Sequence, residues 1–288
     1  ACRRRLDSQL CALDEGTKEH AEDQRRMLSL ASDEETIVRV SAWGMIGTAL
    51  VVFALLVGGR RAGYGRYEEP KIWLASVKID TRLAWIIQEF PMVFWAIRGY
   101  LTARKDCASS WGNVCLWGFL LTHYVQRTFV YPLLIKGNKK TTVYLMFCAF
   151  AYCMWNGHLQ NTWLMRVHVY GDEWVYDPRF LLGITTAITG MGINLHSDHI
   201  LRNLRKPGEK GYKIPKGGMF EHVSGANFFG EILEWTGFAV ASWSLAGVAF
   251  AMFTFCNIGP RGYHHHQWYL EKFDDYPKNR RAVIPYLW

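Results

Sequence analysis

The sequence predicts an all-α fold, an integral membrane bundle of about seven transmembrane helices. Apolar stretches of helix-spanning length recur along the 288 residues, and charged segments separate them, which keeps the mean hydropathy close to zero. The chain also contains 13 Trp, more than a single soluble core needs. A soluble α-helical domain with buried helices is the alternative, but it does not account for seven long apolar stretches.

The first apolar stretch is the clearest transmembrane candidate. Residues 41–57 read SAWGMIGTALVVFALLV without a charge, and with residues 37–40 they reach the roughly 20 residues that cross a bilayer. Residues 1–36 are dense in charges of both signs and have no apolar h-region, so they do not resemble a signal peptide. We therefore divide the chain into a charged, solvated or helical extension, 1–36, and a seven-helix membrane domain, 37–288.

Six further candidate spans follow, and the later ones contain polar residues. They lie near residues 83–103, 111–135, 141–163, 179–196, 225–242 and 243–259. The polar residues within them are Gln88, Glu89, His123, Arg127, Asn156, Asn194 and Glu231. Because ionisable groups at membrane depth are costly, they normally face the bundle interior and indicate a functional site.

The distribution of positive charge predicts the orientation. The chain has 33 Lys and Arg against 25 Asp and Glu, and the positive residues gather in the odd-numbered connections and in the C-terminal tail. The C-terminus is therefore expected in the cytoplasm, in the endoplasmic reticulum membrane of a eukaryote or the inner membrane of a bacterium. This distribution favours a membrane protein with membrane lipids around it over a nucleic-acid partner.

Cysteine and histidine patterns do not predict a metal site. The seven Cys form no CxxC pair, so we interpret them mostly as free thiols. His196 with Asp198, and the triplet at His264, His265 and His266, invite a zinc interpretation, but no HExxH motif accompanies them. The triplet fits better on a helix near the membrane surface.

The segment 190–235 carries the most informative polar pattern. On a helix, Asn194, Asp198, Arg202 and Arg205 are spaced by four, four and three residues and share one face. Such a stripe suits ribose hydroxyls and phosphates, since Arg forks bind phosphate with two hydrogen bonds. Self-paired surface ion pairs are the alternative. No GxGxxG follows a strand, so a nucleotide would be held by loops and helix ends of the bundle.

Two residues within the spans are candidate hydrogen-bond donors to a carbonyl. Glu89 lies in WIIQEFP just before Pro91, where a membrane helix can kink, and a carboxyl group there is expected to stay protonated. Tyr124 lies in THYVQRTFVYP, with Arg127 and Tyr131 three and seven residues further on the same helical face. A structural ion pair for Glu89 and an interfacial tyrosine for Tyr124 are the alternatives.

The chain resembles the steroid 5α-reductase family over roughly residues 60–288. The resemblance rests on INLHSDHILRNLRKPGE, YKIPKGGMFEHVSGANFFGEILEW and HHHQWYLEKFDDYPKNRRAVIPYLW, and on the earlier blocks GYGRY, AWIIQEFP, HYVQRTFVYP and NGHLQ. It implies a seven-helix bundle that transfers a hydride from NADPH to C5 of a 3-oxo-Δ4-steroid, followed by a proton at C4. The family's catalytic pair maps onto Glu89 and Tyr124, which would bind the 3-keto oxygen.

The resemblance also implies the cofactor and substrate contacts. Trp85, with Glu89 and Tyr124, would contact the steroid-like lipid substrate, and the protein is expected to be a monomer. NADPH would be bound by Tyr64, with Gly65 in the same turn, and by Asn194, Asp198, Arg202, Arg205, Asn227, Arg261, His265, Tyr269, Arg127 and Tyr131. Three features depart from the pattern: Lys213 in place of Arg, residues 1–36, and a divergent segment at 97–111.

Other functions remain as alternatives. A related enzyme that reduces a trans-2-enoyl thioester or a polyprenol would share the C-terminal half, but the QEFP and HYVQR blocks favour the steroid branch. A membrane methyltransferase that uses S-adenosylmethionine is a more distant enzyme alternative. A seven-helix receptor or transporter is the non-enzymatic one, and NADPH oxidation that depends on substrate distinguishes it from a reductase.

Overall fold

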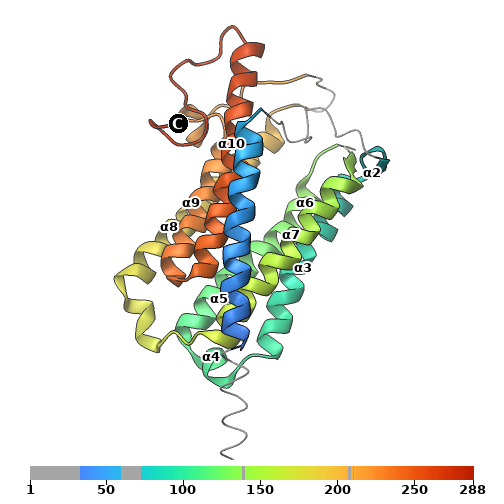
Figure 1. Cartoon of the computed structure of the whole chain (residues 1–288). Helices are drawn as coiled ribbons and strands as arrows, with labels where there is room; N and C mark the ends of the chain where they lie inside the picture. Colours follow the sequence, from blue (N-terminus) through green and yellow to red (C-terminus); the bar gives the residue numbers. More distant parts are fainter. Residues whose placement is uncertain (1–32, 60–72, 138–139, 207–208, 210) are drawn as a thin grey trace, which may run out of the picture.

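The protein is a helical bundle, which confirms the predicted all-α class (Figure 1). The computed structural model describes residues 33–59, 73–137, 140–206, 209 and 211–288. Each predicted apolar stretch lies in a helix. The long helices are Asp33–Val57, α3 (Thr81–Leu101), α5 (Trp111–Val125), α7 (Val143–Thr162), α8 (Pro178–Asn203), α9 (Ala226–Ser242) and α10 (Leu245–Lys272).

Two π-helical turns extend the long helices. η1 (Gln126–Val130) continues α5 into the short α6 (Tyr131–Leu134), and η2 (Trp163–Val167) continues α7. The remaining short elements are α2 (Trp73–Ser76), α4 (Lys105–Ser109) and the 3-10 helices η3 (Asp172–Tyr176) and η4 (Gly218–Glu221). π-Helical turns occur frequently at functional sites, and η1 begins two residues after Tyr124.

A two-stranded ribbon aligns the starts of α3 and α7. Strands β1 (Lys78–Asp80) and β2 (Lys140–Thr142) pair antiparallel, with Lys78 opposite Thr142. Each strand ends in a helix cap: the Asp80 carboxylate accepts from the backbone N–H of Arg82 at 2.9 Å, and the Thr142 hydroxyl accepts from that of Leu145 at 3.4 Å. Further along, Gly157 of α7 packs against Trp95 of α3, so the two helices run side by side in the same direction.

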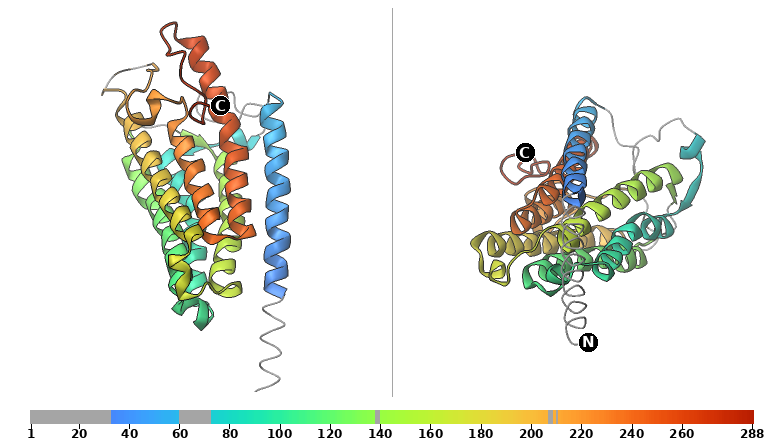
Figure 2. Two further views of the ribbon diagram at one scale, coloured as in Figure 1. Left: turned by 90° about the vertical axis from the view of Figure 1, so that its left-hand side faces the viewer. Right: turned by 60° about the horizontal axis from the view of Figure 1, so that its bottom comes forward.

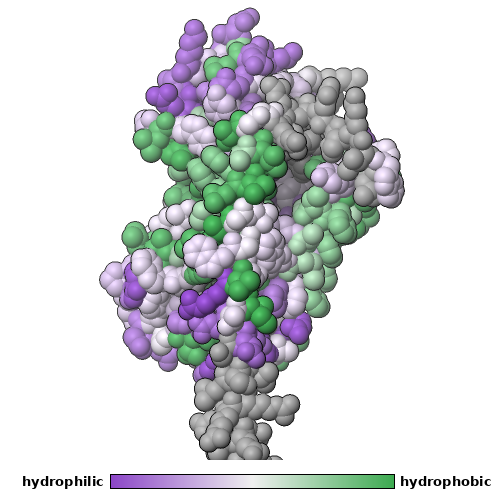
Figure 3. Space-filling view, viewed as in Figure 1, coloured by the Kyte–Doolittle hydropathy of each residue, from purple (hydrophilic) through white to green (hydrophobic). Residues whose placement is uncertain are grey.

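The helix Asp33–Val57 stands along the outside of the bundle (Figure 2). It is the one helix among the described residues whose length and composition meet the criterion for crossing a membrane, so the seven spans stay a prediction. It begins before the predicted boundary at residue 37, because Glu34 forms an ion pair with Arg166 at 2.8 Å. Figure 3 shows hydrophobic residues on this face between a hydrophilic end around the last turns of α10 and more polar residues at the opposite end.

α8 and α9 touch backbone to backbone through glycines. A methyl group added to Gly190 would overlap the backbone nitrogen of Glu234, and one added to Gly230 would lie 2.5 Å from that of Asn194. Small residues at such an interface let two helices approach until their backbones make van der Waals contact. The polar side chains of α8 and α9 therefore occupy fixed positions relative to each other.

We expect Gly190→Ala to lower the free energy of unfolding by about 2 kcal/mol, because the added methyl group forces the two backbones apart. Thermal unfolding in detergent measures the effect. Gly192→Ala on the same helix is the matched control, since nothing lies within 4 Å of its added Cβ. Ala is the better helix former, so the control should match or slightly exceed wild-type stability. Equal melting temperatures for both variants would contradict the close packing of α8 on α9.

Candidate active site

Glu89 contacts Cys153, which belongs to the same buried cluster as Tyr124 in the interior of the bundle. Glu89 lies in the middle of α3, which continues unbroken past Pro91, and Tyr124 occupies the end of α5 and is 5% exposed. Gln88 donates its side-chain N–H to Glu89 Oε1 at 3.2 Å, and the Cys153 thiol of α7 contacts Oε2 at 3.6 Å. The structure thus brings the predicted pair together.

Arg127 is the charged centre of this region. Its guanidinium donates to Asp198 Oδ2 of α8 at 3.3 Å and lies 3.8 Å from Glu231 Oε2 of α9. The same group lies over the rings of Trp85 and Tyr131, at 4.8 and 4.7 Å from their centroids. Arg127 therefore connects α3, α8 and α9 to the helix that carries Tyr124.

The π-helical turn η1 sets the direction of these side chains. The backbone N–H of Tyr131 donates to the carbonyl of Gln126, five residues earlier, so the α-helical register predicted for Tyr124, Arg127 and Tyr131 is not kept. Tyr124 stacks on Trp235 of α9, with the ring centroids 6.0 Å apart, while Arg127 and Tyr131 contact each other. Instead of one shared face, the structure has two groups of contacts: Tyr124 with Trp235, and Arg127 with Tyr131.

Asn194, Asp198 and Arg202 share a face of α8, as the spacing predicts. Asn194 Nδ2 donates to the backbone oxygen of Asn227 at 2.9 Å, so the start of α9 lies against this face. Asp198 is 5% exposed and lies between Arg127 and the positive field of Arg202. Because Asp198 binds Arg127 of a separate segment, self-paired ions on a surface helix do not describe this stripe.

Arg205 lies away from that face, contrary to the predicted helical spacing. α8 ends at Asn203, and the exposed Arg205 guanidinium donates to the backbone oxygen of Gly211 at 3.3 Å. Leu204 is the C-cap of α8 and still has helical backbone angles, so Arg205 lies beyond the end of the helix. Arg205 thus lies just beyond the end of α8, apart from the face that carries Asn194, Asp198 and Arg202. Tyr64 and Gly65 lie outside the described residues.

The other predicted cofactor residues lie on the last turns of α10, which runs well past the predicted end at residue 259. Arg261 and His265 flank the ring of Phe228, at 5.7 Å each, next to Asn227 on α9. Tyr269 stacks almost parallel on Tyr276 of the C-terminal segment, with centroids 5.2 Å apart. These residues form a second group at the α10 end of the bundle.

The C-terminal segment fastens the loop that precedes α9. The backbone N–H groups of Ser224 and Gly225 donate to the carbonyls of Arg281 and Ala282, both at 2.9 Å. Arg280, 2% exposed, donates to the carbonyl of Pro215 at 2.8 Å. In the same loop, the backbone N–H of Gly217 bonds the Glu221 carboxylate and, with nearby Arg280, lowers its pKa. These bonds hold the entrance of α9, where Asn227 lies.

Sequence reasoning missed two acidic partners on α9. Glu231 was singled out only as a polar residue within a span, and it pairs with Arg127. Glu234 was not predicted at all; it is fully buried and its Oε1 lies 2.6 Å from His123 Nδ1. The i, i+3 spacing of the two glutamates in GEILEW, within an apolar stretch, was the available signal.

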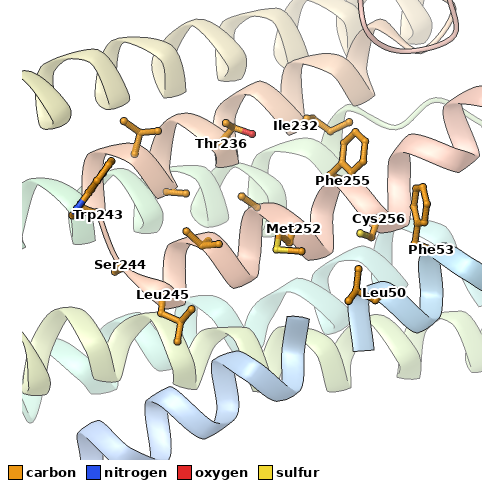
Figure 4. Close-up of a pocket in the computed structure, with 14 residues that line it drawn as sticks. Leu50, Phe53, Ile232, Thr236, Trp243, Ser244, Leu245, Met252, Phe255 and Cys256 are labelled. Carbon is orange, nitrogen blue, oxygen red and sulfur yellow. The ribbon is translucent and has the colours of Figure 1, made fainter. Parts of the chain in front are cut away.

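An apolar groove of about 820 Å³ lies elsewhere, between the helix Asp33–Val57, α9 and α10. Figure 4 shows Leu50 and Phe53 on one side and Ile232, Thr236, Met252 and Phe255 on the other. None of the predicted site residues lines it. Its lining offers hydrophobic contact, and the Cys256 thiol is the one ionisable group among the lining residues.

The arrangement around Glu89 and Tyr124 can polarise an oxygen atom. A carboxyl O–H and a phenol O–H can each donate a hydrogen bond to one carbonyl oxygen placed between them, in a setting from which bulk water is largely excluded. The charged cluster of Arg127, Asp198 and Arg202 offers groups that bind hydroxyls and phosphates.

Comparison with known proteins gives a consistent match. The family model described as 3-oxo-5-alpha-steroid 4-dehydrogenase matches residues 139–288. The chain is 49% identical over 239 residues to 3-oxo-5-alpha-steroid 4-dehydrogenase 1 of Mus musculus, covering 82% of this chain and 92% of that protein. It is 48% identical over 224 residues to the Homo sapiens protein of the same name, covering 78% and 85%, respectively. Identity to the Homo sapiens protein 3-oxo-5-alpha-steroid 4-dehydrogenase 2 is 46% over 241 residues, covering 83% and 92%.

Proposed function

Because the chain belongs to the 3-oxo-5-alpha-steroid 4-dehydrogenase family of oxidoreductases, we propose that it reduces the Δ4 double bond of 3-oxo-Δ4-steroids with NADPH, giving 5α-dihydrosteroids. The observation that supports this reaction is that Glu89 of α3 and Tyr124 of α5 both lie in the bundle interior around Cys153. The chemistry needs two donors at one oxygen, and these residues come from different helices to provide them.

The proposed role of Glu89 and Tyr124 is electrophilic. Both donate a hydrogen bond to the 3-oxo oxygen, which draws electron density away from C5 and stabilises the negative charge that develops on that oxygen. NADPH, when bound, supplies the hydride that enters at C5. A proton at C4 completes the reduction. Trp85 and the surrounding apolar side chains hold the steroid and keep water away from the reacting atoms.

The residues near Asp198 fit NADPH. Two buried polar groups here have no hydrogen-bond partner among the described residues: a guanidinium nitrogen of Arg202 and the hydroxyl of Ser197. Such groups normally bind an acceptor, and a phosphate or ribose oxygen is a suitable one. We assign the nucleotide to Asn194, Asp198, Arg202 and Asn227, with Arg127 and Tyr131 on the nicotinamide side. Arg205, Arg261, His265, Tyr269 and Tyr64 complete the set by family resemblance.

We further propose that all seven long helices cross the membrane, with the C-terminus in the cytoplasm. Exposed apolar residues on α7 support the contact of its outer face with lipid, since Phe147 is 63% exposed and the neighbouring Cys148 is exposed as well. An apolar surface of this kind on a soluble protein would be a liability.

We expect Cys148, as the single cysteine of a functional variant, to resist a membrane-impermeant maleimide in sealed vesicles. Lipid around α7 excludes the water-soluble reagent from the thiol. Mass spectrometry after quenching measures labelling, and labelling after denaturation shows that the thiol is intact. The control carries Ser76→Cys, exposed before α3, and should label in inside-out vesicles. Rapid labelling of Cys148 in intact vesicles would place this part of α7 in water.

The proposed function is tested by mixing the detergent-purified protein with NADPH and either progesterone or testosterone. NADPH loss is followed by absorbance, and the product is identified by chromatography and mass spectrometry. A 5α-dihydro product supports reaction, cofactor and stereochemistry together. NADPH binding without turnover of several such steroids would overturn the substrate assignment in favour of another conjugated lipid, and absence of NADPH binding would overturn the cofactor assignment.

A further inference from the structure

We propose that His123 and Glu234 form a positioning pair that orients Tyr124 for the reaction, an inference that rests on the proposed function. His123 directly precedes Tyr124 on α5, and its Nδ1 lies 2.6 Å from Glu234 Oε1 on α9. Both side chains are removed from solvent, at 4% and 0% exposure. The pair is therefore a direct polar link between α5 and α9, one residue from the proposed donor.

The rings around the pair fix the plane of the phenol. His123 contacts Tyr124 edge-on at 4.9 Å and Trp235 edge-on at 4.6 Å. Trp235 follows Glu234 on α9 and stacks on Tyr124 with an interplanar angle of 23°. The Tyr124 ring thus lies against His123 and Trp235. Glu234 fixes the position of both, because it is hydrogen-bonded to His123 and directly precedes Trp235 in α9. A shift of Glu234 would be transmitted to the Tyr124 hydroxyl.

Glu234 is well suited to act as an anchor, because its own backbone cannot move freely. Its nitrogen lies against Gly190 of α8, where there is no space even for a methyl group. α8 also carries Asp198, which binds Arg127 four residues after His123. The turn that carries Tyr124 is therefore fastened at both ends to the α8–α9 unit, by Glu234 on one side and by Asp198 on the other.

A purely structural role would not call for these groups. Burying an ionisable pair is costly, and apolar side chains of similar volume often stabilise a core as well or better. The cost is compounded here, because Glu234 Oε2 has no hydrogen-bond partner in the described part of the chain. A directional bond, in contrast to apolar packing, sets the angle of the imidazole ring and through it the position of Tyr124.

The test compares Glu234→Leu, which removes the bond, with Glu234→Gln, whose amide oxygen can still accept from His123. Steady-state kinetics with NADPH and a 3-oxo-Δ4-steroid should show kcat about 100-fold lower for Glu234→Leu, since small misplacements of a catalytic group have effects of this size. KM for NADPH should stay within about twofold, because Glu234 contacts none of the proposed nucleotide residues. Glu234→Gln should recover most of the lost turnover.

A double-variant cycle separates positioning from general damage. In a Tyr124→Phe background the phenol is gone, so Glu234→Leu should lower kcat by no more than about twofold further. Gln160→Leu provides the control: Gln160 is 1% exposed and bonds the carbonyl of Ala246 at 2.8 Å, away from the proposed site. Its substitution should lower the melting temperature and leave kcat unchanged in either background.

Two results would overturn the proposal. One is wild-type kcat in folded Glu234→Leu protein, and the other is the same fold-loss with and without the Tyr124 hydroxyl. If Glu234→Leu does not fold, Glu234→Asp makes the same comparison, because its shorter side chain withdraws the acceptor from Nδ1. Failure of the proposed function looks different: the wild-type protein itself would then turn over no 3-oxo-Δ4-steroid.

Discussion

Glu89→Gln is expected to lower kcat for steroid reduction by about 100-fold, while the affinity for NADPH stays at the wild-type level. The loss of one preorganised donor at a developing oxyanion has an effect of this order. An amide N–H is a weaker donor than a carboxylic O–H, so the isosteric variant keeps the shape of the site and loses its electrophilic strength. Glu89 contacts Gln88 and Cys153, neither of which is among the proposed nucleotide residues, so those contacts are expected to stay in place.

Single-turnover measurements with saturating NADPH test this expectation, and cofactor binding is measured separately by fluorescence quenching. Glu173→Gln is the matched control, because it makes the same chemical change at an exposed position in η3. The control should keep wild-type kcat. Full turnover by Glu89→Gln would show that this carboxyl does not polarise the substrate carbonyl.

Arg127→Met is expected to lower the free energy of unfolding by about 3 to 5 kcal/mol, the usual cost of removing one partner of a buried ion pair. The substitution leaves Asp198 and Glu231 without their shared cation, at exposed side-chain fractions of 7% and 22%, and close to each other. The two carboxylates then repel each other inside the bundle, and Arg202 is the positive charge that still acts on Asp198. NADPH affinity should fall as well, because Asp198 loses its fixed position.

Denaturant unfolding in detergent measures the stability change. Arg39→Met removes an ion pair with Glu35 that is exposed on both sides, so it should change the stability by less than about 1 kcal/mol. Adding Asp198→Asn to Arg127→Met should restore part of the lost stability, since it removes one of the stranded charges. If Arg127→Met and Arg39→Met had equal effects, Arg127 would not be the charged centre of the bundle.

The helices were predictable because their signal is local. Each long helix is marked by an apolar stretch, and the predicted ranges match α3, α7 and α9 closely. The ends were less predictable. α10 continues to Lys272 because His264 to Gln267 extend the helix beyond its apolar part, and hydropathy detects only that part. Asp33 to Thr36 likewise join the first helix, since Glu34 pairs with Arg166 from a distant segment.

The site was predictable in its residues and less so in its pairings. Helical spacing placed Asn194, Asp198 and Arg202 on one face, and the structure confirms that face. The partners of Asp198 and Glu234 lie on α5 and its π-helical extension, and no spacing within α8 or α9 identifies them. A π-helical turn has no simple sequence signature, so the divergence of Tyr124 from Arg127 required the structure.

The parallel course of α3 and α7 has a consequence for the biogenesis of the protein. The strands that align these helices are joined by residues 81–139, which contain the whole of α5, so α3 can pack against α7 only after α5 has been synthesised. The contact between Glu89 and Cys153 forms only then. Glu234 and Trp235 emerge from the ribosome later still. A nascent chain that is stopped before α9 therefore lacks Glu231, one of the two carboxylates that pair with Arg127, and Glu234, the partner of His123.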